Sequence, residues 1–326
     1  MAGRRTRRDF VKGSLAAAAG ASLAMSLEEQ VLLAQQPREA TKDAAANLTG
    51  PVKPGSKNTL PTGKLGKLHV SRIILGGNLI GGWAHARDLL YVSELLKAYH
   101  TDEKVLETLQ IAEEHGINCI NTHPDAGKLI QRYRKERGGK MLWLVQSFVD
   151  ESGDLTGIKR SIDQGADSAY IQGNVGDQLV RAGRVDLLGK AVEFIRSQGL
   201  ATGVGGHRLD VPIAVETAKL PVDYHVKTLH SHDYWSAKGP DGKPRDNCWC
   251  ENPKGTIEYM AEITKPWIAF KVMAAGAIPP EKAFTHIFNN GADFAMVGMF
   301  DFQIAKDARI ARKVLAKVKR KRPWQA

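Results

Sequence analysis

Histidines are concentrated in one stretch of this chain, residues 203–235, which holds four of the ten in the sequence. His207 follows one short apolar run and His230 follows the next. Imidazole exchanges protons near neutral pH, so both are candidate catalytic acid or base groups. Lys271, inside a further apolar run, is a third candidate, because a desolvated amine can attack a carbonyl carbon. The alternative for Lys271 is a lysine near the strand end that is ion-paired or reaches the barrel mouth, since burying an unpaired charge is costly.

The same region could hold a divalent metal ion. Imidazoles that follow different strands of one sheet converge, and three of them with a carboxylate leave a position open for water or substrate. Such an ion would polarise a carbonyl group or lower the pKa of a bound water. The sequence lacks a compact ligand motif such as His-Glu-x-x-His, so histidines hydrogen-bonded without metal are the alternative. The predicted ligands are His123, His207, His230, His232 and Asp233.

Amide and indole side chains near the predicted strand ends and in the long loops indicate a binding surface for hydroxyl groups. The predicted substrate-binding residues are Asn121, Gln172, Trp83, Trp235 and Trp249. Gly276 and Gly298 follow the last two apolar runs and are predicted to bind an anion through backbone N–H groups, as loops do in many barrels. Close packing of a helix on the strand end is the alternative role for these glycines.

Eight short apolar runs alternate with longer amphipathic segments, which is typical of βα units around a parallel sheet. Such runs need cover on both faces. Eight strands with their crossings over about 250 residues predict a (β/α)8 barrel, a TIM barrel of the α/β class, with a doubly wound sheet as the alternative. The predicted strands are 72–76, 119–122, 142–146, 169–172, 201–205, 224–228, 267–271 and 294–298.

The connecting segments predict helices and two wall-forming loops. A helix should begin after Thr101, which can cap it, and others should span 180–197 and 279–290. The connections 78–100 and 231–254 are long and rich in aromatic residues and glycine. Long βα loops lie over the C-terminal mouth of a barrel, so we expect a lid or substrate wall there.

The N-terminal residues 1–34 are predicted to be an export signal. Residues 6–12 have the sequence TRRDFVK, which is similar to the twin-arginine export motif, and residues 13–25 form an apolar run too short to span a bilayer stably. This resemblance implies the twin-arginine export machinery as a partner and a periplasmic or otherwise exported location. The mature chain is then expected to have no stable membrane span.

The other boundaries follow from composition. Residues 35–62 are rich in Pro, Gly, Lys and Ala and are predicted to be a flexible tether, followed by the barrel domain at 63–316. The net charge of +11 comes largely from basic runs at the chain ends, which lack interleaved aromatic residues of the kind that stack on bases. We therefore expect a small-molecule substrate rather than nucleic acid, and a solvated basic tail at 317–326.

Two segments carry a resemblance to a known family. Residues 66–76 (GKLHVSRIILG) look like an opening hairpin and first strand, and residues 113–118 (EEHGIN) look like the turn into a second strand. In these features the chain, over residues 60–310, resembles the aldo/keto reductases, which are barrel enzymes that reduce carbonyl groups with NADPH. The resemblance implies the barrel scaffold and, as one possible cofactor, NADP.

The catalytic pattern of that family has no match here. Asn121 stands where the family has Asp, residues 122–126 contain no Tyr, the third strand ends at 145–147 without Lys, and the fourth ends at 171–173 without His. A carbonyl reductase needs a proton donor at the carbonyl oxygen, so this pattern predicts the family's scaffold with a rebuilt mouth.

These patterns predict an exported barrel enzyme, a metal-assisted or histidine-based lyase, isomerase or hydrolase. Its expected substrate is a small polyhydroxylated, sugar-like compound, and its expected cofactor is a divalent metal. One alternative is an NADP-dependent oxidoreductase with a displaced proton donor, for which Tyr133 and Tyr170 are the candidates. The other is a non-catalytic ligand-binding barrel.

Overall fold

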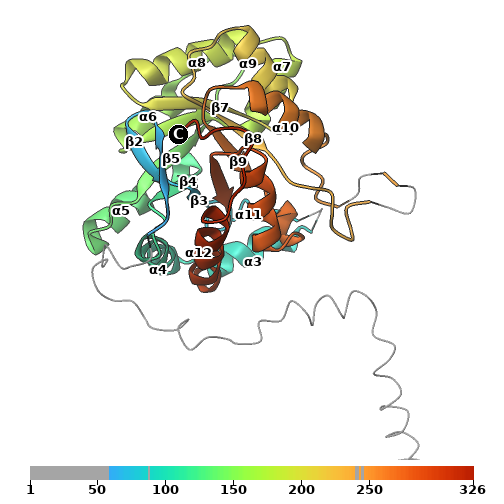
Figure 1. Ribbon diagram of the computed structural model, residues 1–326. Helices are drawn as coiled ribbons and strands as arrows, with labels where there is room; N and C mark the ends of the chain where they lie inside the picture. Colours follow the sequence, from blue (N-terminus) through green and yellow to red (C-terminus); the bar gives the residue numbers. More distant parts are fainter. Residues whose placement is uncertain (1–58, 87–88, 239–241, 244–245) are drawn as a thin grey trace, which may run out of the picture. The chain divides into compact units, whose positions relative to one another are not determined.

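Eight parallel strands form a closed barrel in the computed structural model, which describes residues 59–86, 89–238, 242–243 and 246–326 (Figure 1). Each strand pairs with the next in the sequence, and the last pairs with the first, which confirms the predicted TIM barrel. Every predicted strand is found, with ends shifted by at most one residue. The strands are β3 (Ile73–Gly76), β4 (Cys119–Thr122), β5 (Leu142–Ser147), β6 (Ser168–Ile171), β7 (Ala201–Gly206), β8 (Tyr224–Thr228), β9 (Trp267–Phe270) and β10 (Phe294–Val297).

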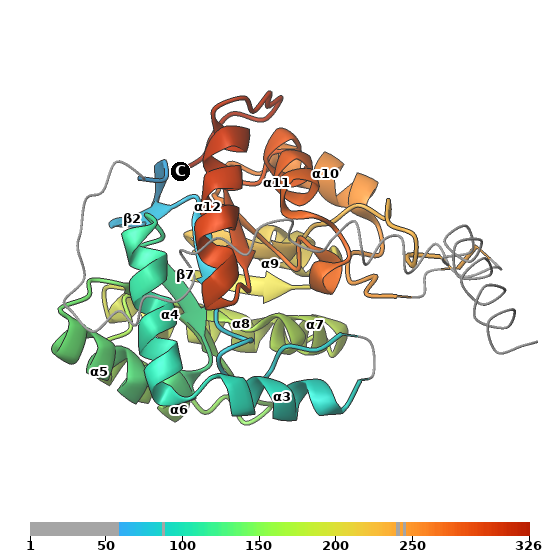
Figure 2. The same ribbon diagram turned by 90° about the horizontal axis from the view of Figure 1, so that it is seen from below.

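Helices surround the strands, with α4 packed between α5 and α12, and α12 beside α11 (Figure 2). Thr101 caps α4 as predicted, accepting a hydrogen bond from the Lys104 N–H at 3.3 Å. The helices are α3 (Tyr91–Tyr99), α4 (Asp102–Glu114), α5 (Gly127–Arg137), α6 (Thr156–Asp163), α7 (Gly173–Arg181), α8 (Val185–Ser197), α9 (Asp210–Thr217), α10 (Pro253–Glu262), α11 (Pro280–Asn289) and α12 (Asp301–Leu315), with 3-10 turns η1 (Pro124–Ala126) and η2 (Ala274–Gly276).

The helix predicted over 180–197 is wrong in its extent. The chain forms two helices there, because α7 ends at Arg181 and α8 begins at Val185. Gly183 lies between them with a φ of 70°, a left-handed conformation that glycine adopts without a Cβ clash. The apolar periodicity runs across this break, so the pattern alone did not reveal it.

The core has two layers, because alternate strand residues point into the barrel or out toward the helices. On β8, Tyr224 and Val226 join the interior cluster, whereas His225 contacts Glu216 of α9 on the outside. Buried indoles such as Trp143 and Trp267 fill the outer layer. Burying each large apolar side chain contributes about 1.5–3 kcal/mol.

A hairpin closes the N-terminal end of the barrel. It consists of β1 (Thr62–Leu65) and β2 (Leu68–Ser71), and Leu65 and Val70 pack into the interior cluster. Thr62, placed in the tether by the sequence prediction, is therefore part of the fold. The predicted signal and the tether up to residue 58 lie outside the described residues. Within the described part of the chain, no helix combines the length and apolarity needed to cross a bilayer.

The C-terminal segment packs on the barrel, which corrects the predicted solvated tail. Arg320 and Arg322 reach the carboxylate of Asp293, at 3.2 and 2.6 Å, and Asp293 has 0 % of its surface exposed. The Trp324 ring lies 4.0 Å from the Arg72 guanidinium and 3.5 Å from that of Arg320. Figures 1 and 2 both place the chain end near β2. The basic run is thus a structural cap on the N-terminal end of the barrel.

Candidate functional site

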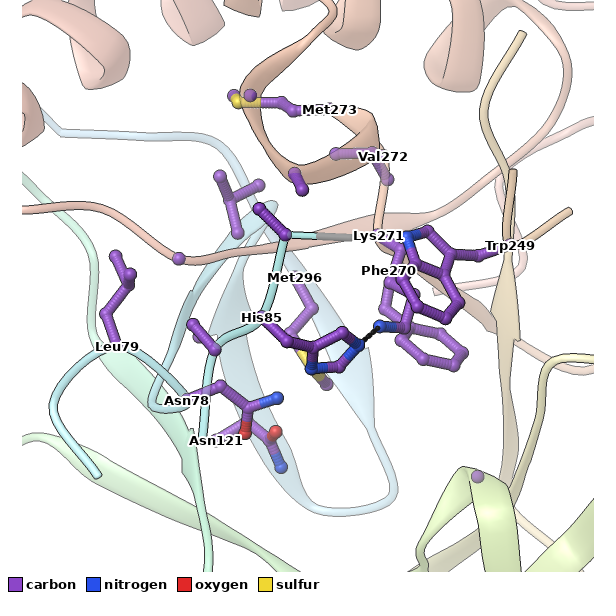
Figure 3. Close-up of a pocket in the computed structure, with 18 of the residues that line it drawn as sticks. Asn78, Leu79, His85, Asn121, Trp249, Phe270, Lys271, Val272, Met273 and Met296 are labelled. Carbon is purple, nitrogen blue, oxygen red and sulfur yellow. Dashed lines mark hydrogen bonds between the residues drawn. The ribbon is translucent and has the colours of Figure 1, made fainter. Parts of the chain in front are cut away.

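A cavity of about 760 Å³ opens at the C-terminal ends of the strands (Figure 3). Both long loops contribute to its wall. The loop after β3 supplies residues 78, 79, 84–86, 92, 95 and 96, and the loop after β8 supplies residues 248, 249 and 251. Seven of the sequence-predicted site residues line it. These are Asn121, Gln172, His207, Trp249, Lys271, Gly276 and Gly298.

His207 forms one side of the cavity and is held by a carboxylate that the sequence analysis missed. Its Nδ1 lies 2.7 Å from Oδ2 of Asp177, and its backbone N–H also donates to Asp177. Its ring meets Phe270 edge-on at 5.0 Å. The ring nitrogen Nε2 has no hydrogen-bond partner among the described residues. His207 therefore has one nitrogen fixed by a carboxylate and the other available to a ligand.

Asp177 reaches His207 because α7 packs very closely on β7. A Cβ at Gly176 would collide with the carbonyl oxygen of Gly205, so only glycine allows this approach. Burial acts to raise the pKa of Asp177, but hydrogen bonds from His207 and the Arg208 backbone outweigh it and hold that pKa below its ordinary value. Asp177 is thus ionised at neutral pH and oriented toward the imidazole.

Lys271 and His85 form a second pair in the cavity (Figure 3). The Lys271 Nζ lies 3.0 Å from His85 Nε2 and 3.9 Å from the centre of the Trp249 ring. Among the described residues Lys271 forms no ion pair, and burial lowers its pKa to about 8. The pKa of His85 is also lowered, mainly by burial and secondly by the nearby positive charge of Lys271. Lys271 therefore lies just beyond the strand end and reaches the barrel mouth, as one form of the predicted alternative has it, without the ion pair of the other form.

Amide side chains form the floor of the cavity. The Gln146 Nε2 donates to Oδ1 of Asn121 at 3.0 Å and to Oδ1 of Asn78 at 3.3 Å. Asn121 in turn donates to the Leu144 carbonyl at 3.0 Å, and the Tyr170 hydroxyl donates to Asn121 Oδ1 at 3.5 Å. Buried amides held by one another present a fixed set of donors and acceptors. Gln172, by contrast, uses its Oε1 to accept the N–H groups that begin α7.

The predicted metal ligands are not gathered into one site. His232 Nε2 bonds to the Cys250 carbonyl oxygen at 2.7 Å, Asp233 pairs with Lys282 at 2.5 Å, and His123 pairs with Asp125 at 3.0 Å. Among the described residues, no three His, Cys, Asp or Glu side chains are placed to hold a metal ion. The residues present do not fit the predicted metal, so we derive no chemistry through one.

His230 does not line the cavity, although the sequence predicted it as a catalytic residue. It has 0 % of its surface exposed, and its Nε2 accepts the N–H groups of Trp249 and Cys250, each at 3.0 Å. Its Nδ1 bonds to the Ser231 carbonyl at 3.0 Å. With both ring nitrogens used and burial lowering its pKa to about 4, His230 is a neutral structural group.

Two of the three predicted indoles lie away from the cavity. Trp83 is 55 % exposed and stacks on His123 at 5.4 Å, and Trp235 is 64 % exposed. Trp249 alone of the three lines the cavity. The spacing of aromatic residues in a loop does not show which of them turns inward, so the sequence could not separate them.

One of the two glycines of the predicted anion site has its backbone N–H already used inside the protein. The Gly276 N–H donates to the Met273 carbonyl at 2.9 Å, so it is not available to a phosphate. The carboxyl of Asp307 lines the same cavity and adds a negative charge. These two observations do not fit the phosphates of NADP, and we derive no step through that cofactor.

Asp307 of α12 is a buried carboxyl group without a partner among the described residues. It is 5 % exposed, and burial raises its pKa from 3.8 to about 6. The ionised form is therefore disfavoured in the folded state. The stability that comes from protonated Asp307 is complete below pH 3.8 and is lost as the pH rises through 6.

Replacing Asp307 by asparagine should therefore stabilise the protein at high pH. At pH 8 we expect the free energy of unfolding to increase by about 3 kcal/mol, from roughly two pKa units at 1.36 kcal/mol each. At pH 3.5 the gain should vanish. Urea unfolding at the two pH values measures this difference. The control Asp163→Asn, on the exposed surface of α6, should change little at either pH, and an equal gain for Asp307→Asn at both would contradict the prediction.

Comparison with known proteins identifies the fold but not the function. No family model matches the chain, and neither does any curated protein. Two solved structures from Pseudomonas aeruginosa, both provisionally named aldo-keto reductases, share 19% sequence identity with it. They match 79% of this chain, with 97% and 98% of their own lengths covered and TM-scores of 0.55 and 0.53. At this identity the similarity shows a shared barrel, and function must be argued from the site.

Proposed function

We propose that this protein is an enzyme in which His207, oriented by Asp177, transfers protons on a small polyhydroxylated compound, in a lyase or isomerase reaction. The observation that carries the proposal is the 2.7 Å contact between these two side chains at the wall of the cavity. A carboxylate that receives the Nδ1–H fixes the tautomer in which Nε2 is a free base, and it stabilises the imidazolium formed when Nε2 takes a proton.

The rest of the cavity supports the proposed substrate class. Its volume of about 760 Å³ suits a small molecule, since ligand pockets range from about 300 to 1,000 Å³. The amides of Asn78, Asn121 and Gln146 on the floor can exchange hydrogen bonds with hydroxyl groups, and the Trp249 ring can cover the C–H face of a sugar. Export by the twin-arginine route stays a prediction.

Proton exchange with solvent tests this proposal directly. The purified protein is incubated in D₂O with a panel of small aldoses and ketoses, and NMR follows loss of the C–H signal next to the carbonyl group. We expect His207→Gln to slow exchange by ~10²–10⁴-fold, the usual contribution of a positioned acid or base. Asp177→Asn should also slow it, because the imidazole loses its fixed tautomer.

The control variant is His69→Gln, which removes an exposed imidazole from the hairpin at the other end of the barrel. It should exchange protons at the wild-type rate. Wild-type activity in His207→Gln would remove His207 from the chemistry. Binding of panel compounds in a thermal-shift assay, with no exchange or conversion, would instead identify a non-catalytic ligand-binding barrel.

A further inference from the structure

We infer that Lys271 is a nucleophile that joins the carbonyl carbon of the substrate as an imine, so that the substrate is an aldehyde or a ketone. The inference rests on the proposed function, because it names the substrate class of the same cavity. Lys271 directly follows β9, and its Nζ lies beside His85 and Trp249 (Figure 3). It lines the same cavity as the floor amides and His207.

Lys227, a second lysine of the barrel, has a structural role, and its hydrogen-bond partners can be compared with those of Lys271. Lys227 on β8 is 1 % exposed, and its Nζ donates to the His207 carbonyl at 2.7 Å and to two oxygens of Thr228 at 2.8 and 3.1 Å. All three of its N–H groups are thus satisfied. Lys271 has one nitrogen acceptor and the face of an indole, with no oxygen partner among the described residues. Its remaining hydrogen-bonding capacity is free for a ligand.

His85 is placed to accept a proton from the Lys271 ammonium group. The His85 Nδ1 lies 3.2 Å from the Trp83 carbonyl oxygen, which can only accept, so Nδ1 carries the hydrogen. The lone pair of Nε2 then faces the Lys271 Nζ at 3.0 Å. Burial lowers the pKa of Lys271 from 10.5 to about 8, which increases the neutral amine near pH 7 by roughly 300-fold relative to an exposed lysine.

The chemical step balances without an added oxidant or reductant. The Lys271 ammonium gives a proton to His85, and the neutral Nζ forms a bond to the carbonyl carbon while the C=O π electrons move to oxygen. That oxygen is protonated twice, by the His85 imidazolium and by the proton still on nitrogen through solvent, and leaves as water. As water leaves, the nitrogen lone pair forms the C=N bond, and the nitrogen keeps its last hydrogen, so the product is already an iminium cation; later hydrolysis regenerates the amine.

The surroundings favour the cationic intermediate. The Trp249 ring, 3.9 Å from Nζ, can stabilise an iminium by a cation–π interaction. The iminium withdraws electrons from the neighbouring C–H bond, which makes proton removal by His207 easier. The His85–Lys271 pair thus supplies the electrophile, and the Asp177–His207 pair supplies the base.

Reductive trapping tests the inference on the full chain. The protein is incubated separately with dihydroxyacetone, D-glyceraldehyde and pyruvate in the presence of sodium cyanoborohydride, which reduces an imine to a stable secondary amine. Peptide mass spectrometry then locates the added mass. With at least one of the three compounds, we expect Lys271 to be labelled at least ten times faster than the exposed lysines. His85→Gln should slow this labelling, whereas Lys282→Arg, at an exposed lysine, should leave it unchanged.

The outcomes separate this inference from the proposed function. The inference is overturned if all three compounds label Lys271 no faster than the exposed lysines. This comparison needs only the wild-type protein. Proton exchange that depends on His207 could still occur in that case and would leave the proposed function intact. His207→Gln should keep the label on Lys271 while losing exchange, because imine formation precedes proton removal.

Discussion

Replacing Asp293 by alanine should lower the free energy of unfolding by about 3–5 kcal/mol, the usual cost of removing one partner from a buried ion pair. Asp293 has no exposed surface and receives the guanidinium groups of Arg320 and Arg322. Its carboxylate also accepts the backbone N–H of Trp267 at 3.0 Å and that of Gln325 at 2.9 Å. Without it, two largely buried cations and two N–H groups lose their acceptor. Urea unfolding followed by circular dichroism measures the loss.

A surface pair provides the matched control for this prediction. Asp186→Ala breaks the exposed ion pair with Arg184 and should leave the free energy of unfolding nearly unchanged, because solvent screens exposed charges. Added salt should leave the effect of Asp293→Ala nearly unchanged, since the buried pair is little screened. A loss below about 1 kcal/mol for Asp293→Ala would mean that the C-terminal segment does not stabilise the barrel as its contacts indicate.

The fold was predictable because parallel strands are buried on both faces and leave a simple signal. The bounds of β4 and β8 agree with their apolar runs, and the other six differ by one residue. The C-terminal segment was mispredicted for a different reason. A run of lysines and arginines is usually solvated, and the sequence does not show that Asp293, nearly thirty residues earlier, lies buried where Arg320 and Arg322 can reach it.

The candidate site was only partly predictable. Asn121, His207 and Lys271 were found because residues at the ends of parallel strands meet at the mouth of a barrel. Asp177 and His85 were missed, since their positions depend on packing: α7 approaches β7 closely at Gly176, and the loop after β3 folds back over β9. Such contacts join segments far apart in the sequence, and no local spacing encodes them.

Replacing His230 by alanine should affect stability rather than chemistry. The variant leaves the buried N–H groups of Trp249 and Cys250 without their acceptor and opens a cavity, and we expect a loss of about 3–5 kcal/mol, since each unsatisfied group costs about 1–3 kcal/mol. Because Trp249 covers Lys271, the wall of the site should also loosen, and substrate affinity should fall more than the maximal rate.

His207→Gln should show the opposite pattern, with little change in unfolding and a large loss of proton exchange, because its Nε2 faces the cavity rather than a backbone donor. Parallel urea unfolding and NMR exchange on the two variants compare these roles. His230→Gln adds a further check, since its amide oxygen can replace the lost acceptor and should recover part of the stability. If His230→Ala keeps wild-type stability and abolishes exchange, the buried imidazole is part of the chemistry after all, and the division between a structural and a catalytic histidine is wrong.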